Sequence, residues 1–254
     1  MSGTWSYDGS LDALVVLAGW ALERSEAPEA VANALAPEGE LFGGKLFGHQ
    51  EPSPLAPTHD AAEARKAARA VRSFSEELYD LVIKIWMSEC PLELALLELC
   101  AEVPARGTPA LHDRRDSRVR ALAQAALRVE REIHRLIGLA RFSLRSDGLY
   151  SAPVEPDHNV AAALMPTFSA RFGIQDFAVV DVKRRLAFVS RASSELSLCG
   201  PEALDLLPDG SDADEPELWR RYFKATDNPS RRNPSLQKQL MPVRYWKHLV
   251  ELRR

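Results

Sequence analysis

Hydrophobic residues recur at helical spacing along much of the chain, most regularly between Ser117 and Leu136. The apolar positions in this stretch follow one another at alternating intervals of three and four residues: Val119, Leu122, Ala126, Val129, Ile133 and Leu136. This spacing predicts one long helix with a single face turned toward a core. Gly138 follows it, at a position where a glycine commonly ends a helix.

Weaker helical patterns predict further helices on either side of this one. They lie at residues 14–22, 59–89, 91–103, 159–172 and 218–225. Asp214 and Glu217 are placed to cap the helix at residues 218–225. We expect residues 231–237 to be turn-rich, and a last helix to begin at Met241-Pro242. In that last helix Tyr245, Trp246 and Leu249 are expected to face inward.

Alternation of apolar and polar residues predicts two β-hairpins in the second half of the chain. The first turns at Asp147-Gly148, and the second turns at the polar step Lys183-Arg184-Arg185. A short strand at residues 4–7 needs a partner later in the chain. We therefore predict an α+β fold, in which about five strands, the N-terminal one among them, form a small, mostly antiparallel sheet. Several helices cover this sheet, and the C-terminal segment is helical.

The composition of the 254-residue chain is typical of a globular protein, with 46% hydrophobic and 27% charged residues. No apolar run approaches the roughly 20 residues that a membrane helix needs. The start of the chain also lacks the basic residues of a secretory signal. These features predict a cytoplasmic protein that does not contact membranes.

The cysteine and histidine spacings do not match known metal-binding patterns. Cys90, Cys100 and Cys199 are widely separated and form no C-x-x-C pair, and the six histidines show no HExxH spacing. We therefore expect reduced thiols, no metal site and no cofactor.

Charge is distributed very unevenly along the chain. Residues 217–254 carry ten Lys and Arg against three Asp and Glu, a net charge of +7, which leaves −11 for residues 1–216. We interpret residues 1–216 as a mixed helix and sheet body that includes a Pro/Gly-rich loop at residues 37–58. Residues 217–254 then form a basic segment packed on that body as one domain. Such charge asymmetry indicates a polyanion-binding end.

The long helix carries the first candidate for acid–base chemistry. Glu130 and His134 are four residues apart, so they project from the same side of a helix, and the carboxylate can orient the imidazole. Arg135 and Arg141 follow as secondary candidates for nucleic-acid contact. The alternative is that His134 and Arg135 stabilise the end of the helix, where cations are favoured by its dipole.

A second candidate lies where the first hairpin leads into the helix at residues 159–172. Asp157 and His158 follow the strand directly, and functional side chains are often carried by loops between regular elements. The alternative is that Asp157 or Asn159 only caps the helix that follows.

The basic C-terminal segment is the candidate surface for nucleic acid. Aromatic side chains can stack on unpaired bases while Arg and Lys bind phosphates. The predicted contact residues are Arg231, Arg232, Asn233, Gln237, Lys238, Arg244, Tyr245, Trp246 and Lys247. The alternative is that the aromatic residues belong to a core while the basic side chains reach solvent.

Several short motifs occur in an order that resembles a known bacterial family. They are YDGS at 7–10, EIHRLIGLARF at 132–142, DGLYSAPVEPDHN at 147–159, DVKRRLAF at 181–188, ELWRRYF at 217–223 and NPSLQKQLMPVRYWKHLVE at 233–251. The chain is similar, over nearly its full length, to a family of DNA metabolism proteins. Its members are encoded beside a radical-SAM protein of DNA repair or modification. A related domain of unknown function is found fused to uracil-DNA glycosylase-like domains.

The resemblance implies a DNA-related role with a radical-SAM iron–sulfur protein as partner. One position departs from the family pattern, because Thr167 stands before Phe168 where relatives have a histidine. This difference favours binding over catalysis at that helix.

Three hypotheses follow. In the first, the protein binds DNA and presents damaged or modified DNA to the radical-SAM partner. In the second, it is a nucleic-acid processing enzyme, of nuclease or base-excision type, that uses Glu130, His134, Asp157 and His158. In the third, it is a scaffold that binds only its protein partner.

Overall fold

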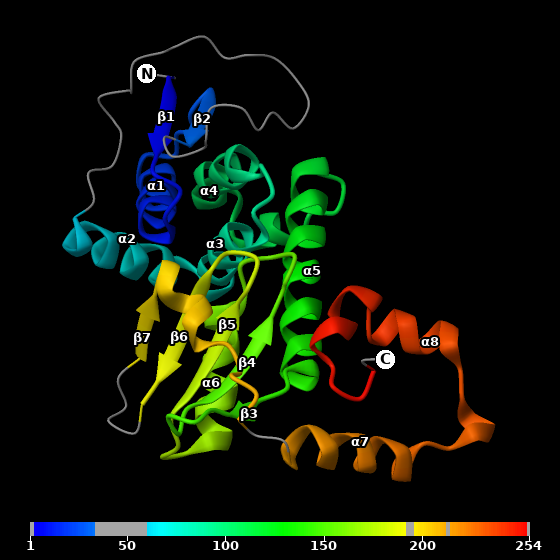
Figure 1. Cartoon of the computed structure of the whole chain (residues 1–254). Helices are drawn as coiled ribbons and strands as arrows, with labels where there is room; N and C mark the ends of the chain where they lie inside the picture. Colours follow the sequence, from blue (N-terminus) through cyan, green and yellow to red (C-terminus); the bar gives the residue numbers. More distant parts are fainter. Residues whose placement is uncertain (1–2, 34–59, 192–195, 212–213, 253–254) are drawn as a thin grey trace. The chain divides into compact units, whose positions relative to one another are not determined.

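The computed structural model describes residues 3–33, 60–191, 196–211 and 214–252 (Figure 1). The chain divides into two compact units, Met1–Val129 and Glu130–Arg254. Residues 130–216 and 217–254 therefore belong to the same unit. The Pro/Gly-rich loop expected at residues 37–58 lies outside the described residues.

The first unit is mainly helical. Its helices are α1 (Leu11–Arg24), α2 (Ala61–Phe74), α3 (Glu76–Ser88), α4 (Glu93–Arg106) and the first part of α5 (Ser117–Leu139). Strands β1 (Thr4–Tyr7) and β2 (Ala30–Asn33) form a separate two-stranded parallel sheet. The N-terminal strand does have a later partner, but our prediction that it joins the larger sheet is wrong. The partner lies just after α1, and a parallel pair needs such a connecting element between its strands.

Helix α1 forms the centre of the core of this unit. Leu14, Leu17, Ala18 and Ala21 are fully buried within it. The N-cap is Ser10, whose side chain accepts a hydrogen bond from the backbone N–H of Ala13 at 3.1 Å. Helix α1 is thereby held at its start and packs against α2 and α4.

Several predicted helix boundaries differ from the structure. The helix expected at residues 218–225 runs from Asp214 to Thr226, so Asp214 and Glu217 lie within it and do not precede it as caps. The stretch at residues 59–89 forms α2 and α3, which are separated at Ser75, because the Ser75 hydroxyl caps α3 by accepting from the N–H of Leu78 at 3.2 Å. Helix α5 continues through Gly138 to Leu139, so Gly138 is not the residue that ends it. The regular apolar stripe of α5 is otherwise confirmed, with Ile133 half-buried and its other members buried.

The second unit contains the predicted small, mostly antiparallel sheet, and five strands make it up. In spatial order they are β3 (Ser143–Leu144), β4 (Tyr150–Val154), β5 (Phe177–Asp181), β6 (Leu186–Ser190) and β7 (Leu196–Cys199). Both predicted hairpins are confirmed as the antiparallel pairs β3–β4 and β5–β6. Strands β4 and β5 are parallel, because α6 (Ala161–Phe172) connects them.

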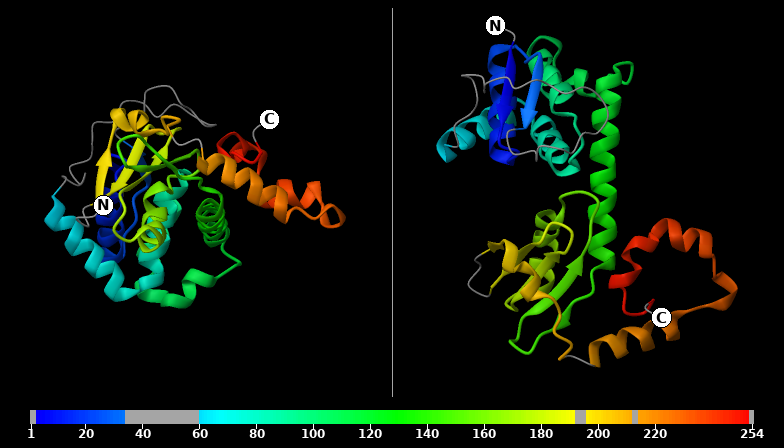
Figure 2. Two further views of the ribbon diagram at one scale, coloured as in Figure 1. Left: turned by 60° about the horizontal axis from the view of Figure 1, so that its bottom comes forward. Right: turned by 45° about the horizontal axis from the view of Figure 1, so that its top comes forward.

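The core of the second unit lies between α6 and the sheet. Phe168 of α6 and Phe177 of β5 are almost fully buried. Phe142 packs edge-on against both rings, with centroid distances of 4.9 Å to Phe168 and 6.0 Å to Phe177. The chain then continues into α7 (Asp214–Thr226), which extends away from the sheet in both views of Figure 2, and α8 (Pro234–Leu240), which leads the chain back toward α5 in the right-hand view.

A prediction follows from the close approach of α1 and α2. A Cβ atom on Gly19 would lie 2.9 Å from the Cβ of Ala67, which is too short for van der Waals contact. We expect Gly19→Ala to lower the free energy of unfolding by about 1–3 kcal/mol, because overpacking outweighs the better helix propensity of alanine. Denaturant unfolding followed by tryptophan fluorescence measures the change.

The matched control is Gly138→Ala, which also changes a helical glycine but adds its Cβ atom in open space. We expect this variant to be stabilised by up to about 1 kcal/mol. Equal effects of the two substitutions would show that the contact with Ala67 has no energetic consequence.

Candidate functional site

A buried carboxylate organises the second unit at the point where three parts of the chain meet. Glu132 of α5 is 1% exposed. Its two oxygens accept hydrogen bonds from consecutive backbone N–H groups, from Asp157 to Oε1 at 2.9 Å and from His158 to Oε2 at 2.8 Å. The loop after β4 is thereby attached to the helix.

The C-terminal segment reaches the same carboxylate through the 3-10 helix Val243–His248. The hydroxyl of Tyr245, a buried residue, donates to Glu132 Oε1. Arg244 Nη2 lies 3.4 Å from this oxygen, 2.8 Å from Asp157 Oδ2 and 2.8 Å from the Tyr245 hydroxyl oxygen. We call Glu132, Asp157, His158, Arg244 and Tyr245 the Glu132 cluster.

The cluster favours an ionised carboxylate. Burial alone raises the pKa of Glu132, but the hydrogen bonds from Tyr245 and from the backbone of Asp157 and His158 outweigh it, and the pKa is lowered. Burial and the neighbouring Glu132 carboxylate raise the pKa of Tyr245. The buried charge is therefore stabilised by several hydrogen bonds, as a buried carboxylate requires.

The loop that carries Asp157 is also held from the sheet side. Arg184 donates to the Asp157 carbonyl at 2.9 Å and to the Pro156 carbonyl at 3.2 Å. Arg184 itself pairs with Asp181, a buried carboxylate at the end of β5, at 2.9 Å. The backbone of Asp157 is thus bound at both its N–H and its carbonyl.

A neighbouring ion-pair group joins the same loop to the 3-10 helix. Glu155 pairs with Lys247, and His248 Nε2 lies 3.4 Å from the same carboxylate oxygen. The hydrogen bond from Lys247 is the main cause that lowers the pKa of Glu155. Together with the Glu132 cluster, these contacts attach the last part of the C-terminal segment to the loop after β4.

The chemical capacity of the Glu132 cluster follows from this geometry. Four donors surround the Glu132 carboxylate, three at Oε1 and one at Oε2, so the group is held in place by the protein and acts as an anchor. The side chains of Asp157 and His158 are exposed and half-buried, respectively, on a backbone that is held in place. Their positions can bind or orient a ligand, and the anchor preorganises them.

The structure separates the two residue pairs proposed for catalysis. Glu130 and His134 are exposed on α5, each two residues from Glu132. Two residues correspond to about 200° of rotation around an α-helix, so both side chains lie on the side of α5 opposite Glu132. Asp157 and His158 lie on the Glu132 side.

Some residues of the predicted C-terminal contact surface are exposed and have no partner in the described ranges, and others form contacts within the protein. No side chain between Glu217 and Arg244 is buried. Arg231 and Lys238 are exposed, and within the described residues neither side chain forms a hydrogen bond or an ion pair. Arg232 pairs with Asp227, and the Asn233 side chain caps α8.

The other predicted contacts lie close to the body of the unit. Tyr245 is 2% exposed and buries its ring, and Trp246 is half-buried and donates from Nε1 to the Met241 carbonyl at 2.8 Å. Together with Leu249 they face inward, as expected. Arg244 and Lys247 stay partly exposed beside their acidic partners. The stretch at residues 231–237 was expected to be turn-rich. It contains the start of α8, which the side chain of Asn233 caps.

Besides the Glu132 cluster and the ion pairs of Glu155, a third group of contacts links Arg141 to α7 and to Glu251. Arg141 pairs with Glu251 at 2.6 Å, donates to the Gly138 carbonyl at 3.0 Å, and places its guanidinium 4.2 Å from the centre of the Trp219 ring. Arg135 is half-buried on α5. The side chains of Arg141 and Glu251 are 9% and 2% exposed, so this pair is part of the interior.

The anchoring role of Glu132 was not predicted, although the sequence contains a signal for it. Glu132 lies three residues after Val129 and four before Leu136, so it falls on the apolar stripe of α5. A carboxylate on a buried helix face needs partners. No comparable signal marks Glu251.

Two further properties bear on the kind of site. Among the described residues, no three His, Cys, Asp or Glu side chains converge in a way that could hold a metal ion. None of the described helices is long and apolar enough to cross a membrane.

The fold and the site define a mixed helix and sheet protein with a basic C-terminal segment anchored through a buried carboxylate. A family model described as Domain of unknown function (DUF4130) matches residues 92–251, and the chain belongs to this family. The match includes the Glu132 cluster and α7 and α8. Comparison with curated proteins and with solved structures found no match.

The Tyr245 hydroxyl allows a direct test of the anchor. We expect Tyr245→Phe to lower the free energy of unfolding by about 1–3 kcal/mol, because Glu132 loses a hydrogen bond inside the protein. The matched control is Tyr222→Phe, which removes a hydroxyl from a residue that is 60% exposed and is expected to change stability by less than about 0.5 kcal/mol. Chemical denaturation of both variants measures the difference, and equal effects would contradict the anchor.

The lowered pKa of Glu132 makes its contribution to stability depend on pH. Its stabilising effect is complete above the ordinary pKa of a glutamate, about 4.3, and is lost as pH falls toward the lower folded-state pKa. We expect Glu132→Gln to cost about 1.5–3 kcal/mol at neutral pH. The difference from the wild type should shrink on acidification. A difference that stays constant down to acid pH would rule out an ionised Glu132.

Proposed function

We propose that the protein binds DNA through residues 217–252, as an accessory protein of DNA repair or modification. The observation that supports this most directly is the absence of any buried side chain between Glu217 and Arg244 in a segment with a strong positive charge. Because these side chains do not build a core, the exposed cations of Arg231 and Lys238 and the exposed ring of Tyr222 remain available to a ligand.

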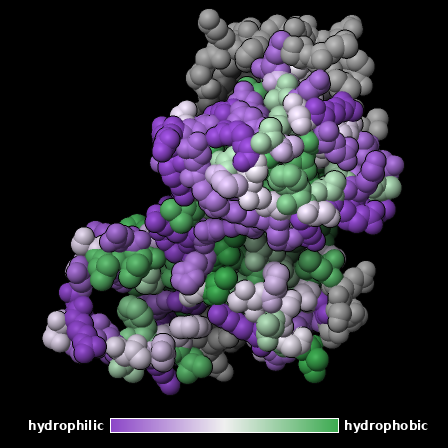
Figure 3. Space-filling model, turned by 180° about the vertical axis from the view of Figure 1, so that it is seen from behind, coloured by the Kyte–Doolittle hydropathy of each residue, from purple (hydrophilic) through white to green (hydrophobic). Residues whose placement is uncertain are grey.

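The exposed residues of this segment have the chemistry that nucleic acids require. Basic side chains alternate with apolar and aromatic ones, as the mixed colours of the segment in Figure 3 illustrate. The exposed basic residues include Arg220, Arg221, Lys224, Arg231 and Lys238. Tyr222 is 60% exposed and is available for stacking on an unpaired base.

A concavity of about 450 Å³ lies between the end of α7 and α8. Its lining includes Arg231, Arg232 and Gln237 beside the half-buried ring of Phe223. Cations, an amide and an aromatic ring in one hollow are suited to a phosphate with its neighbouring base. The hollow therefore supports contact with a single-stranded or distorted region of DNA.

The proposed partner is a radical-SAM iron–sulfur protein, to which damaged or modified DNA is presented. This part of the proposal rests on the ordered motifs described above. The iron–sulfur chemistry then belongs to the partner, and the present chain contributes DNA binding.

One observation favours a second candidate, a scaffold that binds a protein partner. Large apolar side chains are exposed along the same segment: Leu218, Leu236, Leu240 and Val243. Exposed apolar residues that gather on one surface are typical of protein interaction sites. Affinity for DNA falls steeply as the salt concentration rises, whereas binding through apolar surfaces does not. The two candidates can therefore be separated by experiment.

The DNA proposal predicts a steep dependence of affinity on salt. We expect Arg231→Ala/Lys238→Ala to weaken binding and to lower the slope of log affinity against log salt by about 2 for duplex DNA, because about 0.9 counterions are released per phosphate contact. Fluorescence anisotropy with labelled single-stranded, duplex and lesion-bearing oligonucleotides measures both quantities.

The matched control is Arg65→Ala/Lys66→Ala, which removes two cations from exposed positions of α2 in the first unit. It is expected to leave the slope unchanged. Absence of salt-sensitive DNA affinity in the wild type would reject the proposal. Co-purification with a radical-SAM protein that persists in high salt, without DNA binding, would favour the scaffold.

A further inference from the structure

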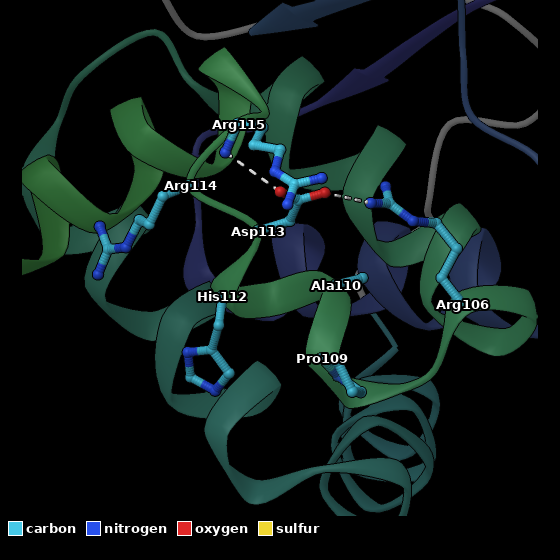
Figure 4. A pocket seen from close by; sticks show the side chains of 7 residues that line it. All are labelled: Arg106, Pro109, Ala110, His112, Asp113, Arg114 and Arg115. Atoms are coloured by element: carbon cyan, nitrogen blue, oxygen red, sulfur yellow. Dashed lines mark hydrogen bonds and ion pairs between the residues drawn. The ribbon is translucent and has the colours of Figure 1, made fainter.

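The first unit contains a concavity of about 620 Å³ between the end of α4 and the start of α5. Figure 4 shows its lining side chains. They are Arg106, Pro109, Ala110, His112, Asp113, Arg114 and Arg115. Three of these seven residues are arginines and one is an acid, so the hollow is a basic site.

The single carboxylate of the lining is already used within the protein. One oxygen of Asp113 pairs with Arg106 at 3.0 Å, and the other accepts the backbone N–H of Arg115 at 3.1 Å. Arg106 also pairs with Glu102 at 2.6 Å. Asp113 therefore shapes the turn and neutralises Arg106 but not the two arginines that follow.

Arg114 and Arg115 supply the available charge. Both are exposed, and within the part of the chain that the structure describes neither guanidinium has a hydrogen-bond or ion-pair partner. Their backbone is fixed, because Arg120 Nη1 donates to the carbonyl of Arg114 at 2.7 Å and to that of Arg115 at 3.0 Å. Two unpaired guanidiniums thus project from a turn that is already ordered.

The lining also indicates the kind of anion. Guanidinium groups bind phosphate oxygens with paired donors. Among the described residues of the lining, only Pro109 and Ala110 are apolar, so these residues do not provide the apolar walls that bury most of a small ligand. An open basic hollow is instead suited to one phosphate of a long polyanion, whose other charges bind elsewhere.

We infer that Arg114 and Arg115, beside Arg106, form a phosphodiester-binding site for the nucleic-acid backbone in the first unit. This inference rests on the proposed DNA binding and extends it to a second surface, separate in sequence from residues 217–252.

The test compares Arg114→Ala/Arg115→Ala with the full-length wild type in anisotropy titrations with a labelled duplex. Loss of two phosphate contacts is expected to lower the salt slope by about 2 and to weaken binding on the order of tenfold at moderate salt. The control is Arg65→Ala/Arg69→Ala, which removes two exposed arginines of α2 and is expected to bind like the wild type. Circular dichroism of each variant verifies that the fold is retained.

The outcomes separate this inference from the function on which it depends. If the wild type binds DNA and Arg231→Ala/Lys238→Ala weakens binding while Arg114→Ala/Arg115→Ala does not, only the second site is rejected. If the wild type shows no salt-sensitive binding, the proposed function itself fails. If Arg114→Ala/Arg115→Ala keeps its DNA affinity but loses binding of pyrophosphate in NMR titrations, the site takes a free phosphorylated molecule and the inference is overturned.

Discussion

The ionised carboxylate of Glu132 is the interaction on which the arrangement of the second unit depends. It joins α5 to the loop after β4 through two backbone N–H groups, and to the 3-10 helix through Tyr245 and Arg244. Each partner alone is a local contact. Together they hold three segments that are far apart in sequence, and removal of the carboxylate would leave donors from two of them, the loop and the 3-10 helix, without this acceptor.

This anchor explains how a segment with almost no core of its own can be held in a defined place. The C-terminal segment buries Tyr245 and Leu249 and pairs Glu251 with Arg141, whereas the side chains from Glu217 to Leu240 are exposed or half-buried. The buried residues and the interior ion pair of the segment are therefore concentrated between Tyr245 and Glu251. The exposed stretch before it is left free to carry cations and rings, which suits the proposed contact with DNA.

Local patterns predicted much of the fold, and contacts between distant residues account for what was missed. Both hairpins and the stripe of α5 depend on neighbours in sequence, so alternation and spacing revealed them. The partner of the N-terminal strand is the short stretch Ala30–Asn33, whose pattern does not distinguish strand from helix. Likewise, Asp157 and His158 could be proposed as a site, but their attachment to Glu132 arises from tertiary structure alone.

The lack of buried side chains between Glu217 and Arg244 also has a consequence for how this stretch can open. Few apolar contacts oppose local unfolding of α7 and α8, so their amide hydrogens should exchange with solvent far faster than those of β5, where every residue is buried. A ligand that orders this stretch loses part of its binding energy to lost chain entropy. Affinity would then be moderate and release rapid, which is consistent with the proposed presentation of DNA to a partner.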